Sequence, residues 1–187
     1  MPVLLVPVPY SVNYHECSQI PDRENPFKLV VPCYIEQNSM QSIMLIEDNP
    51  ADAYLLRDAL RLNQIDDGIT MAQDGETALM KLGAVDRGEL SLPRLVLLDL
   101  NLPKIDGFEV LRSIRERENW SNIPVVVLSS SRHERDIKQC LALGATRYME
   151  KPGDLDGLMR MGAEIKKLLQ AVREHAIDHC DHASVLG

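Results

Sequence analysis

The sequence predicts an α/β protein built around a doubly wound parallel sheet. Five short apolar or β-rich runs alternate with longer segments whose apolar residues recur every three or four positions. This is the pattern of strands alternating with amphipathic helices. Successive strand–helix units form a parallel sheet with right-handed crossovers and helices on both faces. The predicted strands are 43–46, 68–72, 95–98, 125–128 and 147–150.

The first strand is predicted at Ile43–Ile46, because this run is too short for a helix and ends at an acidic pair. A helix follows, for which Asn49 is a suitable cap and Pro50 a suitable first residue. Residues three or four positions apart give this helix one apolar side: Ala53, Leu56, Ala59 and Leu60.

The remaining elements repeat this arrangement. Gly68–Ala72 is a weaker second strand, and the helix after it is predicted to be capped by Asp74 and to run to about Leu82, before Gly83. Leu95–Leu98 is a run of four apolar residues, which suits a strand that helices cover on both faces. The other predicted helices span about 106–117, 132–143 and 155–175.

With 187 residues, the chain has the length of one domain of typical size plus an extension. The five strand–helix units define a single domain over residues 42–175. Residues 1–41 show no useful periodicity, so we expect a poorly ordered N-terminal extension, or a start-site artefact with Met40 as the initiator. Phe27–Val31 leaves a docking arm as the alternative. Residues 176–187 form a C-terminal tail that is too short to fold as an output module.

Composition argues against several classes of function. The net charge of −8 argues against non-specific nucleic-acid binding. The sequence contains no apolar run of about 18 residues, so it predicts no membrane span. Prolines interrupt the apolar N-terminus, which argues against a secretory signal. Scattered cysteines indicate reduced thiols in a cytoplasmic protein. These cysteines are Cys17, Cys33, Cys140 and Cys180.

Chemically matched side chains follow four of the predicted strands. They are the pair Glu47 and Asp48, then Asp99, Ser129 and Lys151. Because the carboxyl ends of parallel strands meet in one crevice, where such folds bind ligands, we expect these side chains to lie together. Three carboxylates, a hydroxyl and an ammonium group predict a site for a divalent cation and a phosphoryl group.

The residue types indicate separate roles within this site. Asp99 is the candidate nucleophile, because a carboxylate at the end of a buried strand can form an acyl phosphate. Glu47, Asp48 and Asp99 offer the hard oxygen ligands that Mg²⁺ prefers, and the backbone carbonyl of Asn101 can add a fourth. Phosphoryl transfer to an anion needs positive charge more than it needs a base.

The two remaining side chains suit the phosphoryl group itself. Lys151 supplies a point charge for a phosphoryl oxygen or for Asp99. Ser129 offers a hydroxyl donor that would engage a phosphoryl oxygen only in the modified state, and would so bias the segment that follows it.

The segments around these residues resemble the receiver domain of bacterial two-component response regulators, the superfamily of the chemotaxis regulator. The resemblance covers about residues 42–172. It rests on five motifs in order: Leu45–Asp48, Leu98–Pro103 followed by Asp106-Gly107, Pro124–Ser129, Gly144-Ala145 and Tyr148–Pro152. We read Asp106-Gly107 as a turn and helix start rather than as part of the site. Leu100–Pro103 and Ser129–Ile137 further resemble the stand-alone regulators associated with bacterial phytochromes.

This resemblance implies a flavodoxin-like five-stranded sheet of order 2-1-3-4-5 and phosphoryl transfer to Asp99 from a histidine kinase or a histidine phosphotransfer protein. It also implies that Tyr148 is a switch aromatic that moves inward when Ser129 engages the phosphoryl group; plain core packing of Tyr148 is the alternative. Two residues depart from the commonest pattern without a change of chemistry: Glu47 replaces Asp, and Ser129 stands where Thr is common.

The leading interpretation is therefore a signalling phosphoacceptor that catalyses only its own phosphorylation and dephosphorylation and signals through a downstream protein partner. A homodimer through the fourth helix, fifth strand and fifth helix is expected from the family. An aspartyl phosphohydrolase is the first alternative, but Asn101 stands where such enzymes carry a second acid. A phosphorylation-independent adaptor is the second alternative.

The C-terminal tail carries a group of potential metal ligands. These are His175, His179, Cys180 and His182. The first two are spaced as neighbours on one helix face. We favour a frayed helix end over a metal site, because no further strand or helix is predicted to complete the coordination.

Overall fold

The computed structural model describes residues 43–65 and 68–183, with side chains described as far as Val172. The expectations for residues 1–41, including the docking arm at Phe27–Val31, lie outside this part of the chain. In the described residues no helix is both long enough and apolar enough to cross a membrane.

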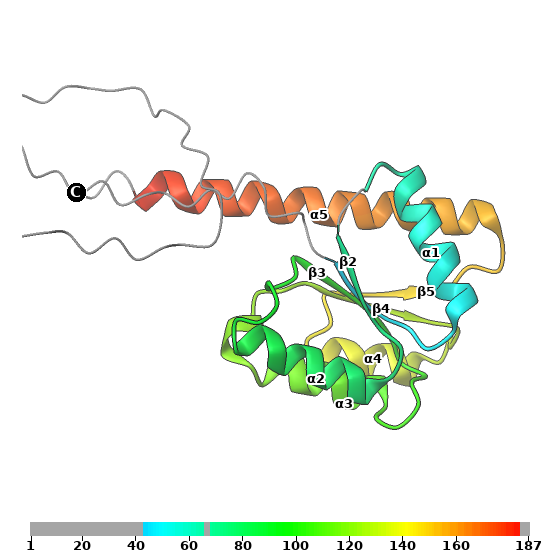
Figure 1. The fold of residues 1–187 in the computed structure, drawn as a ribbon. Coiled ribbons are helices and arrows are strands. Elements are labelled where there is room, and N and C mark those ends of the chain that lie inside the picture. Colours follow the sequence, from blue (N-terminus) through cyan, green and yellow to red (C-terminus); the bar gives the residue numbers. More distant parts are fainter. Residues whose placement is uncertain (1–42, 66–67, 184–187) are drawn as a thin grey trace, which may run out of the picture. The chain divides into compact units, whose positions relative to one another are not determined.

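Five parallel strands form one sheet in the order β2-β1-β3-β4-β5, which confirms the predicted fold class and strand order (Figure 1). The strands are β1 (Ile43–Ile46), β2 (Ile69–Ala72), β3 (Leu95–Asp99), β4 (Val125–Ser129) and β5 (Arg147–Glu150). The order places β1, β3 and β4 in the interior of the sheet, where every residue of these strands is buried. This burial explains why their sequences are continuous apolar runs.

Helices cover both faces of the sheet, with α1 and α5 on one face and α2, α3 and α4 on the other (Figure 1). The helices are α1 (Pro50–Leu62), α2 (Gly75–Asp86), α3 (Gly107–Arg115), the short 3₁₀ helix η1 (Glu118–Trp120), α4 (Glu134–Ala142) and α5 (Leu155–Ala183). Alternation along each strand divides the core between the two faces. Leu97 packs on the α1 and α5 side, whereas Leu98 packs on the opposite side.

Two predicted helix starts are confirmed by their caps. The Asn49 side chain accepts a hydrogen bond from the backbone N–H of Ala51 at 2.9 Å, and Pro50 is the first residue of α1. Asp74 Oδ1 accepts from the N–H of Thr77 at 2.6 Å at the start of α2. These caps satisfy backbone donors that would otherwise lack an intrahelical partner.

Two predicted helix ends are wrong. α2 continues past Leu82 to Asp86, so Gly83 lies inside the helix, and the left-handed conformation falls on Gly88, at a φ of +73°. One interior glycine costs a helix only about 1 kcal/mol, which packing can offset. α5 likewise continues beyond the predicted end at His175, to Ala183. No glycine or proline interrupts the sequence between Val172 and Ala183.

The other two predicted helices differ from the observed ones by a few residues. α3 ends at Arg115 and is followed by η1, whereas the sequence predicted a helix to residue 117. α4 covers Glu134–Ala142, one residue shorter at its end and two at its start than predicted. For the tail residues His175, His179, Cys180 and His182, the sequence favours a frayed helix end over a metal site. These residues belong to α5, but their side chains are outside the described part of the chain.

Candidate functional site

The carboxyl edge of the sheet carries a cluster of charged side chains. Lys151 follows β5 and places its Nζ atom 2.6 Å from Asp99 Oδ2 and 2.7 Å from Glu47 Oε2. Asp99 is the last residue of β3, and Glu47 directly follows β1. Ile46 lies opposite Leu98 in the sheet register, so the residues that follow these two reach the same level. Three of the predicted site residues are therefore in direct contact.

The ammonium group of Lys151 is shared by three carboxylates, because Nζ also lies 3.0 Å from Asp52 Oδ2. The Lys151 side chain is 15% exposed, and those of Glu47 and Asp99 are 2% and 5% exposed. Burial acts to lower the pKa of Lys151, but hydrogen bonds to the three carboxylates outweigh burial and raise this pKa above its ordinary value. Lys151 is therefore a permanent cation at this edge of the sheet.

Burial acts in the opposite direction on the neighbouring acid. It raises the pKa of Glu47, and the hydrogen bond and charge of Lys151 offset this effect only in part. The charge of Asp99 adds to the increase. A second cation beside Glu47 would therefore relieve an electrostatic cost that Lys151 alone does not remove.

Asp99 is held in place by the backbone of the loop that follows β3. Its Oδ1 atom accepts a hydrogen bond from the N–H of Asn101 at 3.0 Å. Gly107, the first residue of α3, approaches this loop so closely that an added Cβ would lie 2.3 Å from the Asp99 carbonyl oxygen. Asp106 caps α3 by accepting from the N–H of Glu109 at 2.9 Å, which confirms Asp106-Gly107 as a turn and helix start. The close approach of α3 to the loop after β3 therefore requires glycine at position 107.

Glu47, Asp48 and Asp99 form the candidate cation site. One carboxylate oxygen from each lies within 4.8 Å of the other two. Asp48 is exposed while its two partners are buried, so the trio opens to solvent on one side. Carboxylate oxygens are the ligands that Mg²⁺ prefers, and Mg²⁺ usually keeps several waters, which an open side permits. The donor set therefore fits a hard divalent cation.

Two hydroxyl side chains, Ser129 at the end of β4 and Tyr148 in β5, contact the loop that follows β4. Ser129 is fully buried, and its Oγ accepts a hydrogen bond from the N–H of Ser131 at 3.1 Å. The half-buried Tyr148 donates its hydroxyl to the carbonyl oxygen of Ser131 at 2.7 Å. The backbone N–H of Lys151 donates to the carbonyl oxygen of Ser129 at 2.9 Å. The peptide bond between Lys151 and Pro152 is trans. The side chains of Ser129 and Tyr148 thus both form hydrogen bonds with the backbone of Ser131.

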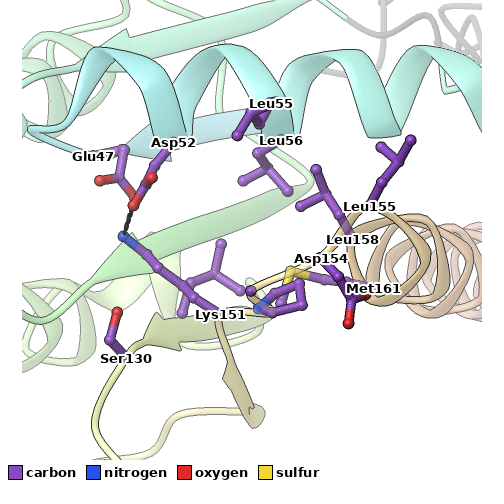
Figure 2. Close-up of a pocket in the computed structure, with 13 residues that line it drawn as sticks. Glu47, Asp52, Leu55, Leu56, Ser130, Lys151, Asp154, Leu155, Leu158 and Met161 are labelled. Atoms are coloured by element: carbon purple, nitrogen blue, oxygen red, sulfur yellow. Dashed lines mark hydrogen bonds and ion pairs between the residues drawn. The ribbon is translucent and has the colours of Figure 1, made fainter.

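Asp52 was not singled out by the sequence analysis. It lies in the first turn of α1, and its side chain is 38% exposed. The sequence feature that could have indicated Asp52 is its position four residues after Asp48. It lies at the start of the helix that follows β1, and this start must be near the carboxyl edge of the sheet. Asp52, Glu47 and Lys151 together line one end of a pocket of about 370 Å³. Figure 2 shows that leucines of α1 and α5, among them Leu56 and Leu158, line its other end.

Fold and site together define an α/β protein with an acidic cluster and a buried lysine at the carboxyl edge of a flavodoxin-like sheet. Residues 43–162 match the family described as the response regulator receiver domain. The chain therefore belongs to the receiver-domain family of two-component response regulators.

Sequence relatives of known name support this assignment. The chain is 41% identical over 125 residues to the probable methanogenesis regulatory protein FilR2 of Methanothrix harundinacea, covering 67% of this chain and 81% of that protein. It is 39% identical over 127 residues to the response regulator Rcp1 of Synechocystis, covering 67% and 86%.

Solved structures show the same similarity. The phosphorylated cyanobacterial phytochrome response regulator RcpA aligns with a TM-score of 0.64 and 37% identity, over 70% of this chain and 94% of that chain. The Mn²⁺-bound form of Rcp1 aligns with a TM-score of 0.62 and 36% identity, over 67% and 91%. The resemblance to phytochrome-associated regulators that the sequence indicated is thereby confirmed.

Proposed function

We propose that this chain accepts a phosphoryl group on Asp99 from the phosphohistidine of a histidine kinase or a histidine phosphotransfer protein. The observation that carries this proposal is the contact of the Lys151 ammonium group with the buried Asp99 carboxylate at 2.6 Å. An anionic nucleophile can attack an anionic phosphoryl group only where positive charge is already in place. Lys151 provides such charge without further rearrangement.

The transfer itself requires few functional groups from the protein. An oxygen of the Asp99 carboxylate forms a bond to phosphorus while the phosphorus–nitrogen bond of phosphohistidine breaks, and the imidazole nitrogen leaves with the electron pair. Lys151 orients Asp99 and neutralises charge at the acceptor. Glu47, Asp48, Asp99 and the backbone carbonyl of Asn101 would hold Mg²⁺, which when bound supplies further positive charge at the transferring group.

Ser129 and Tyr148 are proposed to convert the modification into a signal. The Ser129 hydroxyl now accepts from the Ser131 N–H, and it remains able to donate to a phosphoryl oxygen. A shift of this loop toward the phosphoryl group would break the hydrogen bond from Tyr148 to the Ser131 carbonyl. Tyr148 would then be free to turn inward, and the face formed by α4, β5 and α5 would change.

The same face is our proposal for the contact with a downstream protein or with a second copy of the chain. Leu141 of α4 is 49% exposed. Arg147 of β5 and Glu164 of α5 form an exposed ion pair on this face at 2.8 Å. We propose a cytoplasmic location, where the phosphohistidine of a kinase partner is presented.

An aspartyl phosphohydrolase is not favoured by the site. In that class of enzyme a second acid two residues after the nucleophile acts as acid and base, and this position is Asn101. Its backbone N–H binds the Asp99 carboxylate. We infer that the chain catalyses only its own phosphorylation and dephosphorylation. A phosphorylation-independent adaptor would have no use for a buried lysine shared by three carboxylates.

Intact-mass measurement after incubation with acetyl phosphate and Mg²⁺ tests this proposal. We expect the wild-type chain to gain one phosphoryl group and Asp99→Asn to gain none, because the amide is not a nucleophile for phosphorus. Asp58→Asn, an exposed carboxylate change on α1, serves as the control and should label as wild type does. Labelling that persists in Asp99→Asn would place the acceptor at another residue.

A further inference from the structure

Asp52 is the one carboxylate on Lys151 that lies outside the candidate cation site. The trio for the cation is Glu47, Asp48 and Asp99. Asp52 instead reaches Lys151 Nζ from the first turn of α1, with 38% of its side chain exposed. Asp52 is therefore a carboxylate at the site that is not among the proposed cation ligands.

The position of Asp52 brings its charge close to the reacting atoms. A single ammonium group separates its Oδ2 atom from the Oδ2 atom of Asp99, through contacts of 3.0 and 2.6 Å. Asp52 also lies at the end of the pocket that opens between α1 and α5 (Figure 2). The lining of this pocket includes Glu47, Asp52 and Lys151. A leaving group that occupied it while Asp99 bonds to phosphorus would lie beside the Asp52 carboxylate.

A fixed negative charge at this place has opposite effects on two kinds of leaving group. A carboxylate leaving group gains negative charge as its bond to phosphorus breaks, and Asp52 repels that charge. A protonated nitrogen leaving group carries positive charge or an N–H donor, which Asp52 attracts. The difference grows in the transition state, where charge on the leaving group changes.

We propose that Asp52 is a specificity-determining residue that favours phosphoryl donors with a protonated nitrogen leaving group over donors with an anionic oxygen leaving group. This inference rests on the proposed function and adds a residue that sets the donor preference of the same site. In both reactions an Asp99 oxygen bonds to phosphorus. The bond that breaks is phosphorus–nitrogen in one, where the amine leaves, and phosphorus–oxygen in the other, where a carboxylate leaves.

Two small donors separate these cases: acetyl phosphate, which releases acetate, and phosphoramidate, whose leaving nitrogen is protonated. We would measure the labelling rate of the full chain with each donor at fixed Mg²⁺ and take their ratio. Asp52→Asn should raise the acetyl phosphate rate relative to the phosphoramidate rate by about fivefold, the size expected for one partly exposed charge. Asp52→Glu keeps the charge and should keep the wild-type ratio.

Asp58→Asn removes a charge from the same helix away from the pocket and should also leave the ratio unchanged. An equal ratio in wild type and Asp52→Asn, or the same shift in Asp58→Asn, would overturn the inference while the labelling itself supports the proposed function. Failure of wild type to label with either donor would overturn both.

A second measurement needs neither donor nor cation. If Asp52 binds Lys151, Asp52→Asn should lower the melting temperature in EDTA more in the wild-type chain than in a Lys151→Met background. The loss of a negative charge from the first turn of α1 affects both backgrounds alike, so the difference isolates the ion pair. Equal losses in both backgrounds would show that the pair does not form and would overturn the inference.

Discussion

One ammonium group at the carboxyl edge of the sheet balances several carboxylates. Two of its three partners, Glu47 and Asp99, are almost fully buried. A buried acid without a cation is costly, since desolvation is no longer offset by an opposite charge. Lys151 is therefore expected to stabilise the fold before any phosphoryl group arrives, as well as to assist the chemistry.

Lys151→Ala tests this double role. Without a divalent cation the variant should lose about 3 kcal/mol of unfolding free energy, the usual cost of removing one member of a buried pair. Mg²⁺ binding should be retained, because no proposed ligand is removed and a competing positive charge is absent. Thermal melts in EDTA and in Mg²⁺ measure both effects, and Mg²⁺ should raise the melting temperature more in the variant than in wild type.

The control is Lys138→Ala, which removes a lysine with a 77% exposed side chain from an ion pair with Glu134 on α4. Exposed pairs of this kind contribute at most about 1 kcal/mol. A loss in Lys151→Ala as small as the loss in Lys138→Ala would contradict the stabilising role. Partner binding that responds to phosphorylation as in wild type would argue against Lys151 as part of the signal.

At this scale the sequence was informative where a residue follows a strand. Glu47, Asp99 and Lys151 could be predicted to meet because strand ends in a parallel sheet have only one edge to share. Asp52 could not be predicted in the same way. Whether a residue in the first turn of a helix faces a site depends on the rotation of that helix, which packing against α5 determines here.

At the scale of elements, Asp74 and Lys104 join two loops at the same edge of the sheet. Lys104, in the loop after β3, has a φ of +69°, a conformation that costs a side-chain-bearing residue on the order of 1 kcal/mol. Its Nζ atom lies 2.8 Å from Asp74 Oδ2 and 3.0 Å from Glu76 Oε2 at the start of α2. These contacts hold the loop that follows the acceptor strand.

Asp74→Asn tests this contact through the pH dependence of stability. Hydrogen bonds from Lys104 and Thr77 lower the pKa of Asp74 from 3.8 to about 2. The unfolded chain therefore binds more protons than the folded chain in this interval. The contribution of Asp74 is complete above pH 3.8 and is lost as pH falls through 2. We expect the melting temperature of Asp74→Asn to fall less steeply than that of wild type between these pH values.

Glu76→Gln is the matched control, since Glu76 also contacts Lys104 but is 61% exposed. Its melting temperature should follow the wild-type pH dependence closely. Parallel curves for Asp74→Asn and wild type would show that Asp74 carries no such protonation linkage.

The type and order of the elements could be predicted from periodicity, but several ends could not. The sequence predicts Gly83 as the end of α2, but the helix continues through it because Leu82 and its neighbours still pack on the sheet. A glycine permits a left-handed backbone conformation, but packing determines whether the chain adopts it. α5 shows the converse, because its sequence offers no stop signal before Ala183.

At the scale of the whole molecule, the described residues complete the sheet and cover both of its faces. One core cluster lies between the sheet and α2, α3 and α4, with Trp120 fully buried in it. The other lies under α1 and α5. Arg115 links α3 to the chain on either side of β4 by donating to the carbonyl oxygens of Ile123 and Gly144. Every residue of both core clusters therefore belongs to β1 or to a later part of the chain.

Removal of residues 1–39, so that the chain starts at Met40, should therefore leave the melting temperature nearly unchanged. The reason is that Ile43 already pairs with Ile69 and Leu95 on its two sides and is fully buried by the described elements. The labelling rate with acetyl phosphate should also be retained, because every proposed site residue follows Ile43. A melting temperature lower by several degrees, which for a domain of this size corresponds to about 1 kcal/mol, would instead show that the N-terminal residues pack on the receiver domain. In that case a second truncation that keeps Phe27–Val31 would tell whether this apolar segment carries the stabilisation.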